Sequence, residues 1–242
     1  MDENLLNEVL VAREKMKACA LSHTAEFKDC EQRFVAMSNI SDITGLPSTL
    51  DEAYLCAPKV KEELDAILVL FASQEGLIIQ NPSEAELSAY SIPSVLLVPI
   101  KDRARAEMKM KINLDGPVQL PGDIVRCSVL CRDVEQIRSA YSLLRERFLV
   151  VKVQNRLLNP TLTGFRDIQM NFALALVPNI GTCSTFIFEV QFVLQELKAL
   201  ARTLGLHKLY VQIRQLQDVK AFQKVLEERE HTMADKSTKH VC

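Results

Sequence analysis

Residues 185–194 constrain the fold most, because their side chains alternate between apolar and polar. Successive side chains of a β-strand point to opposite faces of the sheet. One face of this segment would hold Phe186, Phe188, Val190 and Phe192. The other face carries Glu189 and Gln191, flanked by Ile187 and Val193. The pattern predicts a buried strand with a carboxylate in its middle.

An ionised carboxylate in apolar surroundings is costly unless something pairs with it. The partner of Glu189 is then either the cation of a structural salt bridge or a metal, cation or substrate hydroxyl. The first alternative makes Glu189 part of the framework, and the second makes it part of a site. The residues of this strand alone leave both alternatives open.

A second alternating segment precedes this one, at residues 164–174. Its apolar side would hold Ile168, Met170, Phe172 and Leu174, and its polar side Asp167, Gln169 and Asn171. Gly181 and Cys183 lie between the two segments, which predicts an antiparallel hairpin. Such a sheet packs helices on its apolar side and leaves its polar side open. Glu189 is expected on the open side.

The order of the remaining elements predicts an α+β fold with a mixed β-sheet and an N-terminal helical region, because helices come first and then alternate with strands. We expect a helical region over 1–90, a sheet-bearing domain over 91–231 and a disordered tail over 232–242. The expected elements are a connector at 76–82, strand 94–100, basic helix 101–111, strand 123–131, helix 133–148 capped by Asp133, helix 194–204 and a mostly helical 211–229. The strands at 123–131, 166–176 and 185–194 should share one sheet, with the helix starting at Asp133 on its apolar face.

The amino-acid composition limits the classes of binding partner that are expected. The 242 residues carry a net charge of −2, with 48% hydrophobic and 25% charged residues, as in water-soluble globular domains. This balance argues against an electrostatic binder of DNA. No apolar run is long enough to span a bilayer, and no signal peptide follows Met1, so we expect a cytoplasmic protein without a membrane partner. Seven scattered cysteines and four histidines lack zinc-ligand spacing.

Four short motifs follow one another in an order that resembles the RelA/SpoT synthetase family. That family has a basic helix, a strand that begins with Asp and contains Arg, a Gly-Tyr strand and a Glu-(Val/Ile)-Gln strand. The corresponding segments here are 101–111, Asp123-Ile-Val-Arg126, Gly164-Phe165-Arg166-Asp167 and Glu189-Val190-Gln191. The similarity extends over residues 95–214, and is to divergent relatives that read Gly-Tyr-Arg-Asp.

The resemblance implies a nucleotidyltransferase fold and transfer of a phosphoryl-containing group, in this family pyrophosphoryl, from ATP to a ribose hydroxyl. It places Asp123 and Glu189 as catalytic residues and as ligands of Mg²⁺, with Glu189 also able to accept the hydroxyl proton. It implies that ATP and substrate are bound by Lys101, Arg103, Lys109, Lys111, Arg126, Gln191 and His207. Phe165 stands where the family has the Tyr that stacks on the acceptor base, and its aromatic face suffices for stacking.

The sequence also departs from the family. Gln169 replaces a His, position 193 lacks an Arg, and the histidine–aspartate signature of the family's hydrolase domain is missing. Three functions remain: transfer to a nucleotide, transfer to RNA, or a catalytically inactive domain that binds a nucleotide, RNA or protein. The acidic net charge speaks against free RNA. A protein partner would contact the N-terminal helices.

Overall fold

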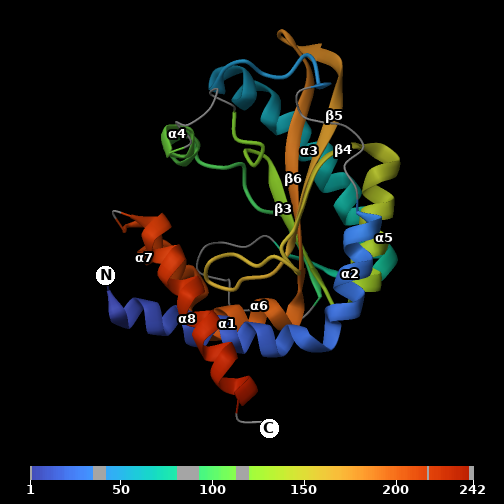
Figure 1. The fold of residues 1–242 in the computed structure, drawn as a ribbon. Coiled ribbons are helices and arrows are strands. Elements are labelled where there is room, and N and C mark those ends of the chain that lie inside the picture. The colour runs from blue at the N-terminus through green and yellow to red at the C-terminus, as the bar shows by residue number, and fades with distance from the viewer. Residues whose placement is uncertain (1, 35–41, 81–92, 113–119, 217, 240–242) are drawn as a thin grey trace.

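The computed structural model describes residues 2–34, 42–80, 93–112, 120–216 and 218–239 (Figure 1). Eight α-helices and one six-stranded sheet are assigned within these ranges. The helices are α1 (Glu3–Ala20), α2 (Thr24–Arg33), α3 (Leu50–Glu75), α4 (Arg103–Ile112), α5 (Val134–Arg147), α6 (Gln195–Thr203), α7 (Leu206–Arg214) and α8 (Val219–Lys239). The strands are β1 (Ile78–Gln80), β2 (Ser94–Leu96), β3 (Arg126–Cys131), β4 (Leu149–Asn155), β5 (Ile168–Ile180) and β6 (Cys183–Leu194).

The sheet is mixed, with strand order β1-β2-β3-β6-β5-β4. The β5–β6 hairpin is antiparallel, as its alternation predicts, while β3 pairs with β6 in parallel. The three strands expected to share one sheet therefore do so, and the predicted α+β fold with a mixed sheet is confirmed.

Helices α3 and α5 lie on the apolar side of this sheet, and α4 lies on the other side (Figure 1). The rings of Phe172 and Phe188 stack on one another with their centroids 5.6 Å apart. The ring of Phe148, which directly follows α5, contacts both of them edge-on. Asp133 caps α5 as predicted, since its Oδ1 accepts from Gln136 N at 2.9 Å. One core joins α1, α3 and α5 to the strands, so the predicted helical region 1–90 packs into the same core as the sheet.

Several element boundaries differ from the sequence predictions. The expected connector 76–82 contains β1, an edge strand formed by the β-branched Ile78 and Ile79. The basic helix starts only at Arg103, because Asp102 acts as its cap and accepts from Arg105 N at 3.2 Å. Lys101 therefore precedes the helix, although the sequence predicted a helix that begins at residue 101.

The C-terminal region also differs. The expected helix 211–229 is two helices, α7 and α8, and Asp218 starts the second by accepting from Ala221 N at 2.9 Å. Part of the tail predicted to be disordered is helical, because α8 continues to Lys239. Glu, Met, Ala and Lys occur in this part of the sequence, and all four are strong helix formers. None of the described helices is long and apolar enough to cross a membrane. The sequence also predicts a loop over residues 113–122, and most of it, residues 113–119, lies outside the described residues.

Candidate functional site

The polar face predicted for the hairpin exists and extends onto β3. Arg126 pairs in register with Glu189, which pairs in turn with Asn171 on β5. Two residues along β6 from Glu189, Gln191 pairs in register with Ser128 on β3 and with Gln169 on β5. Because alternate residues share a face, these six side chains cover one side of three adjacent strands. This row of polar groups is the floor of the candidate site.

Asp123 is held at the edge of this floor by three cations. It lies in the turn before β3, since the strand starts at Arg126 and not at Asp123 as predicted. Its Oδ2 is in contact with the Lys101 ammonium, lies 3.0 Å from Lys109 Nζ on α4 and 3.9 Å from Arg126 Nη1. Its Oδ1 is buried and has no hydrogen-bond partner. Burial acts to raise the pKa of Asp123, but the hydrogen bond from Lys101 and the charge of Lys109 outweigh it and hold the pKa below its usual range.

Glu189 is in the opposite situation. It is 8% exposed, and its Oε1 accepts a hydrogen bond of 2.9 Å from Gln191 Nε2. Burial raises the pKa of Glu189, and the negative charge of nearby Asp123 raises it further. The backbone holds Glu189 beside the turn that carries Asp123, because Glu189 N donates to Val125 O in that turn at 3.0 Å. Two carboxylates 66 positions apart in sequence thus share one site.

The donor set can be compared with what Mg²⁺ requires. Within the described residues no group of three or more His, Cys, Asp or Glu side chains is arranged to hold a metal. Mg²⁺ is commonly bound by only one or two carboxylates, with water and phosphate oxygens completing the shell. Asp123 Oδ1 is an unpartnered buried oxygen, and the mutual repulsion of Asp123 and Glu189 would be relieved by a cation between them. The two carboxylates therefore fit a metal that is shared with a phosphate.

The same face becomes apolar toward the end of β6. Leu96, Leu130 and Val193 form a small buried cluster there, and Phe165 packs against it. From Glu189 to Val193 the strand advances about 13 Å, at roughly 3.3 Å per residue. The Lys198 ammonium of α6 lies 5.4 Å from the centroid of the Phe165 ring. The candidate site thus has a charged end and an aromatic end.

The Gly164–Asp167 motif builds the loop that carries Phe165. Gly164 has φ +85°, a conformation that favours glycine. Arg166 donates to the carbonyl oxygen of Leu157. Asp167 was expected on the open polar face, but it immediately precedes β5, is fully buried and pairs with the Arg156 guanidinium. The sequence did not predict roles for Arg156, Ser128 and Lys198, because their partners Asp167, Gln191 and Phe165 lie in other strands or loops.

Three predicted substrate-binding residues lie outside this cluster or cannot be placed in it. Arg103 pairs with two other carboxylates, with its Nη1 2.7 Å from Asp51 Oδ1 and its Nε 3.2 Å from Glu107 Oε1. His207 is exposed on α7, whose main contacts are with α1 and α6. The side chain of Lys111 lies outside the described residues.

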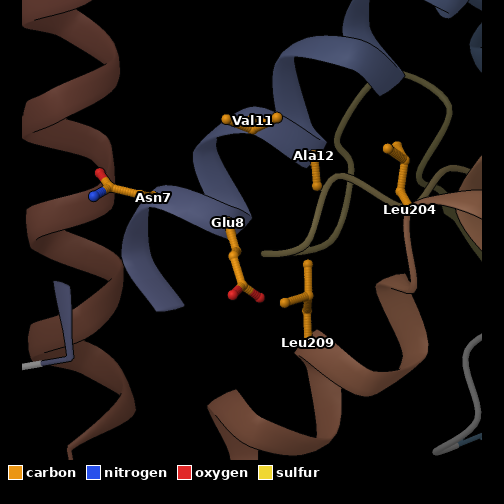
Figure 2. A pocket seen from close by; sticks show the side chains of 6 residues that line it. All are labelled: Asn7, Glu8, Val11, Ala12, Leu204 and Leu209. Carbon is orange, nitrogen blue, oxygen red and sulfur yellow. The ribbon is translucent and has the colours of Figure 1, made fainter. Parts of the chain in front are cut away.

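A shallow apolar hollow elsewhere on the molecule shares no residue with the site. It lies between α1 and the α6–α7 segment (Figure 2). Its lining is formed by Asn7, Glu8, Val11, Ala12, Leu204 and Leu209. Because it lacks the carboxylates and cations gathered around Asp123, this hollow is not the candidate site.

Several solved structures have a fold similar to that of this chain. The structure of small alarmone synthetase 2 from Bacillus subtilis matches 79% of this chain and 96% of its own, with a TM-score of 0.50 and 14% identity. Small alarmone synthetase 1 from Bacillus subtilis, bound to its product pppGpp, matches 80% of this chain and 96% of its own (TM-score 0.45, 15% identity). A GTP pyrophosphokinase family protein from Streptococcus pneumoniae matches 77% and 89% (TM-score 0.47, 14% identity). No family model and no curated protein matches the sequence. The chain has the RelA/SpoT-like synthetase fold, as the sequence motifs implied.

Proposed function

We propose that this protein transfers a pyrophosphoryl group from ATP to a ribose hydroxyl of a nucleotide. The observation that carries the proposal is the meeting of Asp123 and Glu189 on an open polar face, beside Lys101, Lys109 and Arg126. Phosphoryl transfer depends mainly on positioning and on neutralising charge, which is what such a cluster supplies. The synthetase-like fold is compatible with this chemistry.

Each residue has a role in this proposal. Lys109 and Arg126 bind phosphate oxygens of ATP, and Lys101 holds Asp123 in place. Asp123 and Glu189 would hold Mg²⁺, which when bound supplies further neutralisation of the phosphate charge. Gln191 occupies Oε1 of Glu189 and leaves Oε2 for the acceptor hydroxyl or the metal. Phe165 offers a ring on which the acceptor base stacks.

The first acceptor to test is a guanosine nucleotide. The solved neighbours include a GTP pyrophosphokinase family protein and a synthetase bound to pppGpp. The net charge of −2 makes a free RNA a poorer candidate. Transfer to GTP breaks the bond between the α- and β-phosphates of ATP, forms a new ester at the ribose and yields AMP and a proton.

The experiment incubates the protein with ATP, Mg²⁺ and GTP and separates the nucleotides by ion-exchange chromatography. We expect AMP and a pyrophosphorylated guanosine nucleotide in equal amounts. Glu189→Gln should abolish both products while the protein still unfolds in one cooperative thermal transition. The matched control is Glu146→Gln, a change of the same type at an exposed position of α5. Absence of AMP with GTP, GDP and ADP as acceptors, from folded protein, would reject the proposal.

A second candidate function is a catalytically inactive domain that binds a nucleotide, RNA or protein in a larger assembly. It is favoured by the three cations around Asp123 Oδ2, which already neutralise that carboxylate without a metal. Calorimetric titration separates the two candidates. An enzyme of the proposed kind should bind ATP more tightly when Mg²⁺ is present, whereas an inactive domain should show no dependence on Mg²⁺ or no binding.

A further inference from the structure

Arg13 joins three segments that lie far apart in the sequence. From α1, its Nη1 donates to the carbonyl oxygens of Thr161 at 3.2 Å and of Leu162 at 3.1 Å. Its Nε and Nη2 face the carboxylate of Glu230 on α8, with Nη2 2.9 Å from Oε2. This bidentate pair is only partly exposed, at 20% for the Arg13 side chain and 27% for Glu230. Such geometry is directional as well as strong.

The loop that Arg13 holds is the one that carries Phe165. Within it, Phe165 N donates to Thr161 Oγ1 at 3.0 Å, and Thr161 N donates to Phe165 O at 3.1 Å. Gly164 N donates to Thr161 O at 2.8 Å, so Thr161 O is shared with Arg13. A Cβ at Gly164 would lie 3.0 Å from the Cα of Arg13. The loop therefore packs against Arg13, the same residue of α1 that donates hydrogen bonds to it. A displacement of Arg13 would move Phe165.

Charge explains why Glu230 belongs to the arrangement. Arg166 follows Phe165 directly, and its pKa is lowered by burial and by the nearby charge of Arg13. Two guanidinium groups thus approach one another beside the loop. The carboxylate of Glu230 compensates for this repulsion, because it pairs with two of the three guanidinium nitrogens of Arg13, Nε and Nη2. Loss of Glu230 would leave two neighbouring cations at the base of the loop.

We propose that the Arg13–Glu230 pair is a positioning device that fixes the 161–165 loop, and so fixes the Phe165 ring at the apolar end of the polar face. The pair therefore sets the affinity for the acceptor base and leaves the ATP phosphates at the Asp123 end unaffected. The part that concerns the acceptor rests on the proposed function. The part that concerns the loop does not.

The chain contains no tryptophan, so Phe165→Trp places a single tryptophan in the loop, whose emission can be excited selectively. In this background Arg13→Gln and Glu230→Gln each remove one side of the pair. The matched control is Arg229→Gln, which breaks another α1–α8 ion pair, between Arg229 Nη2 and Glu3 Oε2 at 2.8 Å, without touching the loop. The measurements are the emission maximum and the quenching of the tryptophan by acrylamide.

We expect both test variants to shift the emission to longer wavelength and to increase quenching, while the control does neither. In the otherwise native chain, Arg13→Gln should raise KM for GTP by about tenfold, because a displaced binding group loses affinity and rate steeply. KM for ATP should change less than about twofold, because the ATP phosphates bind at the Asp123 end. A general loss of structure would instead raise both KM values.

Emission and quenching equal to those of the control in both test variants would overturn the positioning of the loop. A shifted emission with an unchanged KM for GTP would overturn the role in acceptor binding. If the native chain does not bind GTP, the proposed function fails. The fluorescence measurements then still test whether the Arg13–Glu230 pair positions the loop. If Arg13→Gln does not fold, Glu230→Gln decides alone, because it removes only the carboxylate of the pair and leaves the Arg13 side chain in the protein.

Discussion

At the scale of single residues, the two carboxylates of the site differ in what surrounds them. Asp123 is contacted by Lys101, Lys109 and Arg126, and its pKa is lowered. Glu189 receives one hydrogen bond, from the neutral Gln191, and its pKa is raised. The same removal of charge should therefore have opposite effects on the stability of the folded protein at the two positions.

Glu189→Gln is expected to stabilise the protein without ligand at neutral pH, by about 0.5–2 kcal/mol, because a poorly compensated buried charge is removed and the shape is kept. Thermal melting of the variant and the native chain measures the change. A clear loss of stability instead would mean that Glu189 is a member of a structural ion pair, which was the first alternative left open by the sequence.

The same variant should show a defined pH dependence. Because the folded pKa of Glu189 is raised, the folded native chain binds this proton more tightly than the unfolded chain does. The resulting stability is present below the ordinary glutamate pKa of 4.5 and is lost as pH rises through the folded value. The advantage of Glu189→Gln should therefore be large at pH 7–8 and shrink toward acidic pH.

Asp123→Asn is expected to destabilise the protein by about 3–5 kcal/mol, because it leaves the buried Lys101 ammonium without its partner. Chemical denaturation at pH 7 measures this change in the free energy of unfolding. Lys101→Met in addition should recover part of the loss, since the unpaired cation is then removed as well. Equal stability of Asp123→Asn and the native chain would show that the ion pair contributes nothing.

At the scale of elements, α4 presents its basic residues in two directions. Lys109 reaches Asp123, whereas Arg103, six positions earlier, pairs with Asp51 of α3 and lies over the Tyr54 ring at 5.8 Å. Six residues correspond to a rotation of about 600° around the helix axis, which is one full turn plus about 240°. The two side chains therefore point to different sides of the helix.

Lys109→Ala should weaken ATP binding roughly ten- to a hundredfold, equivalent to about 1.5–3 kcal/mol for a charge-assisted contact with phosphate. Arg103→Ala should change it less than about twofold, because Arg103 is directed toward Asp51 and Glu107. Isothermal titration with ATP and Mg²⁺ measures both. Equal losses for the two variants would contradict the arrangement of α4 described above.

At the scale of the whole molecule, the helices before residue 90 belong to the core of the sheet domain. In α3, Val60, Leu64 and Leu68 are buried, and they belong to the same hydrophobic cluster as the aromatic face of β5 and β6. α1 contributes Leu6, Val9 and Met16 to that cluster.

A fragment of residues 91–231 is therefore expected not to fold cooperatively. Each buried aliphatic side chain contributes about 1.5–3 kcal/mol, and a domain of this size is stable by only about 5–15 kcal/mol. Circular dichroism melting of the fragment, compared with the full chain, tests this. A sharp thermal transition of the fragment would support the boundary near residue 90 that the sequence suggested.

The sequence by itself determined the hairpin, its two faces and the position of Glu189 on the polar one, because alternation with a period of two is a local property of a strand. It also determined the start of α5, since Asp133 caps its own helix. Only the tertiary structure decided which cations meet Asp123, that Arg103 turns to α3, that Asp167 is buried against Arg156, and that Arg13 and Glu230 hold the Phe165 loop. These contacts join residues from separate elements, and their geometry follows from how the helices pack on the sheet, which no local pattern encodes.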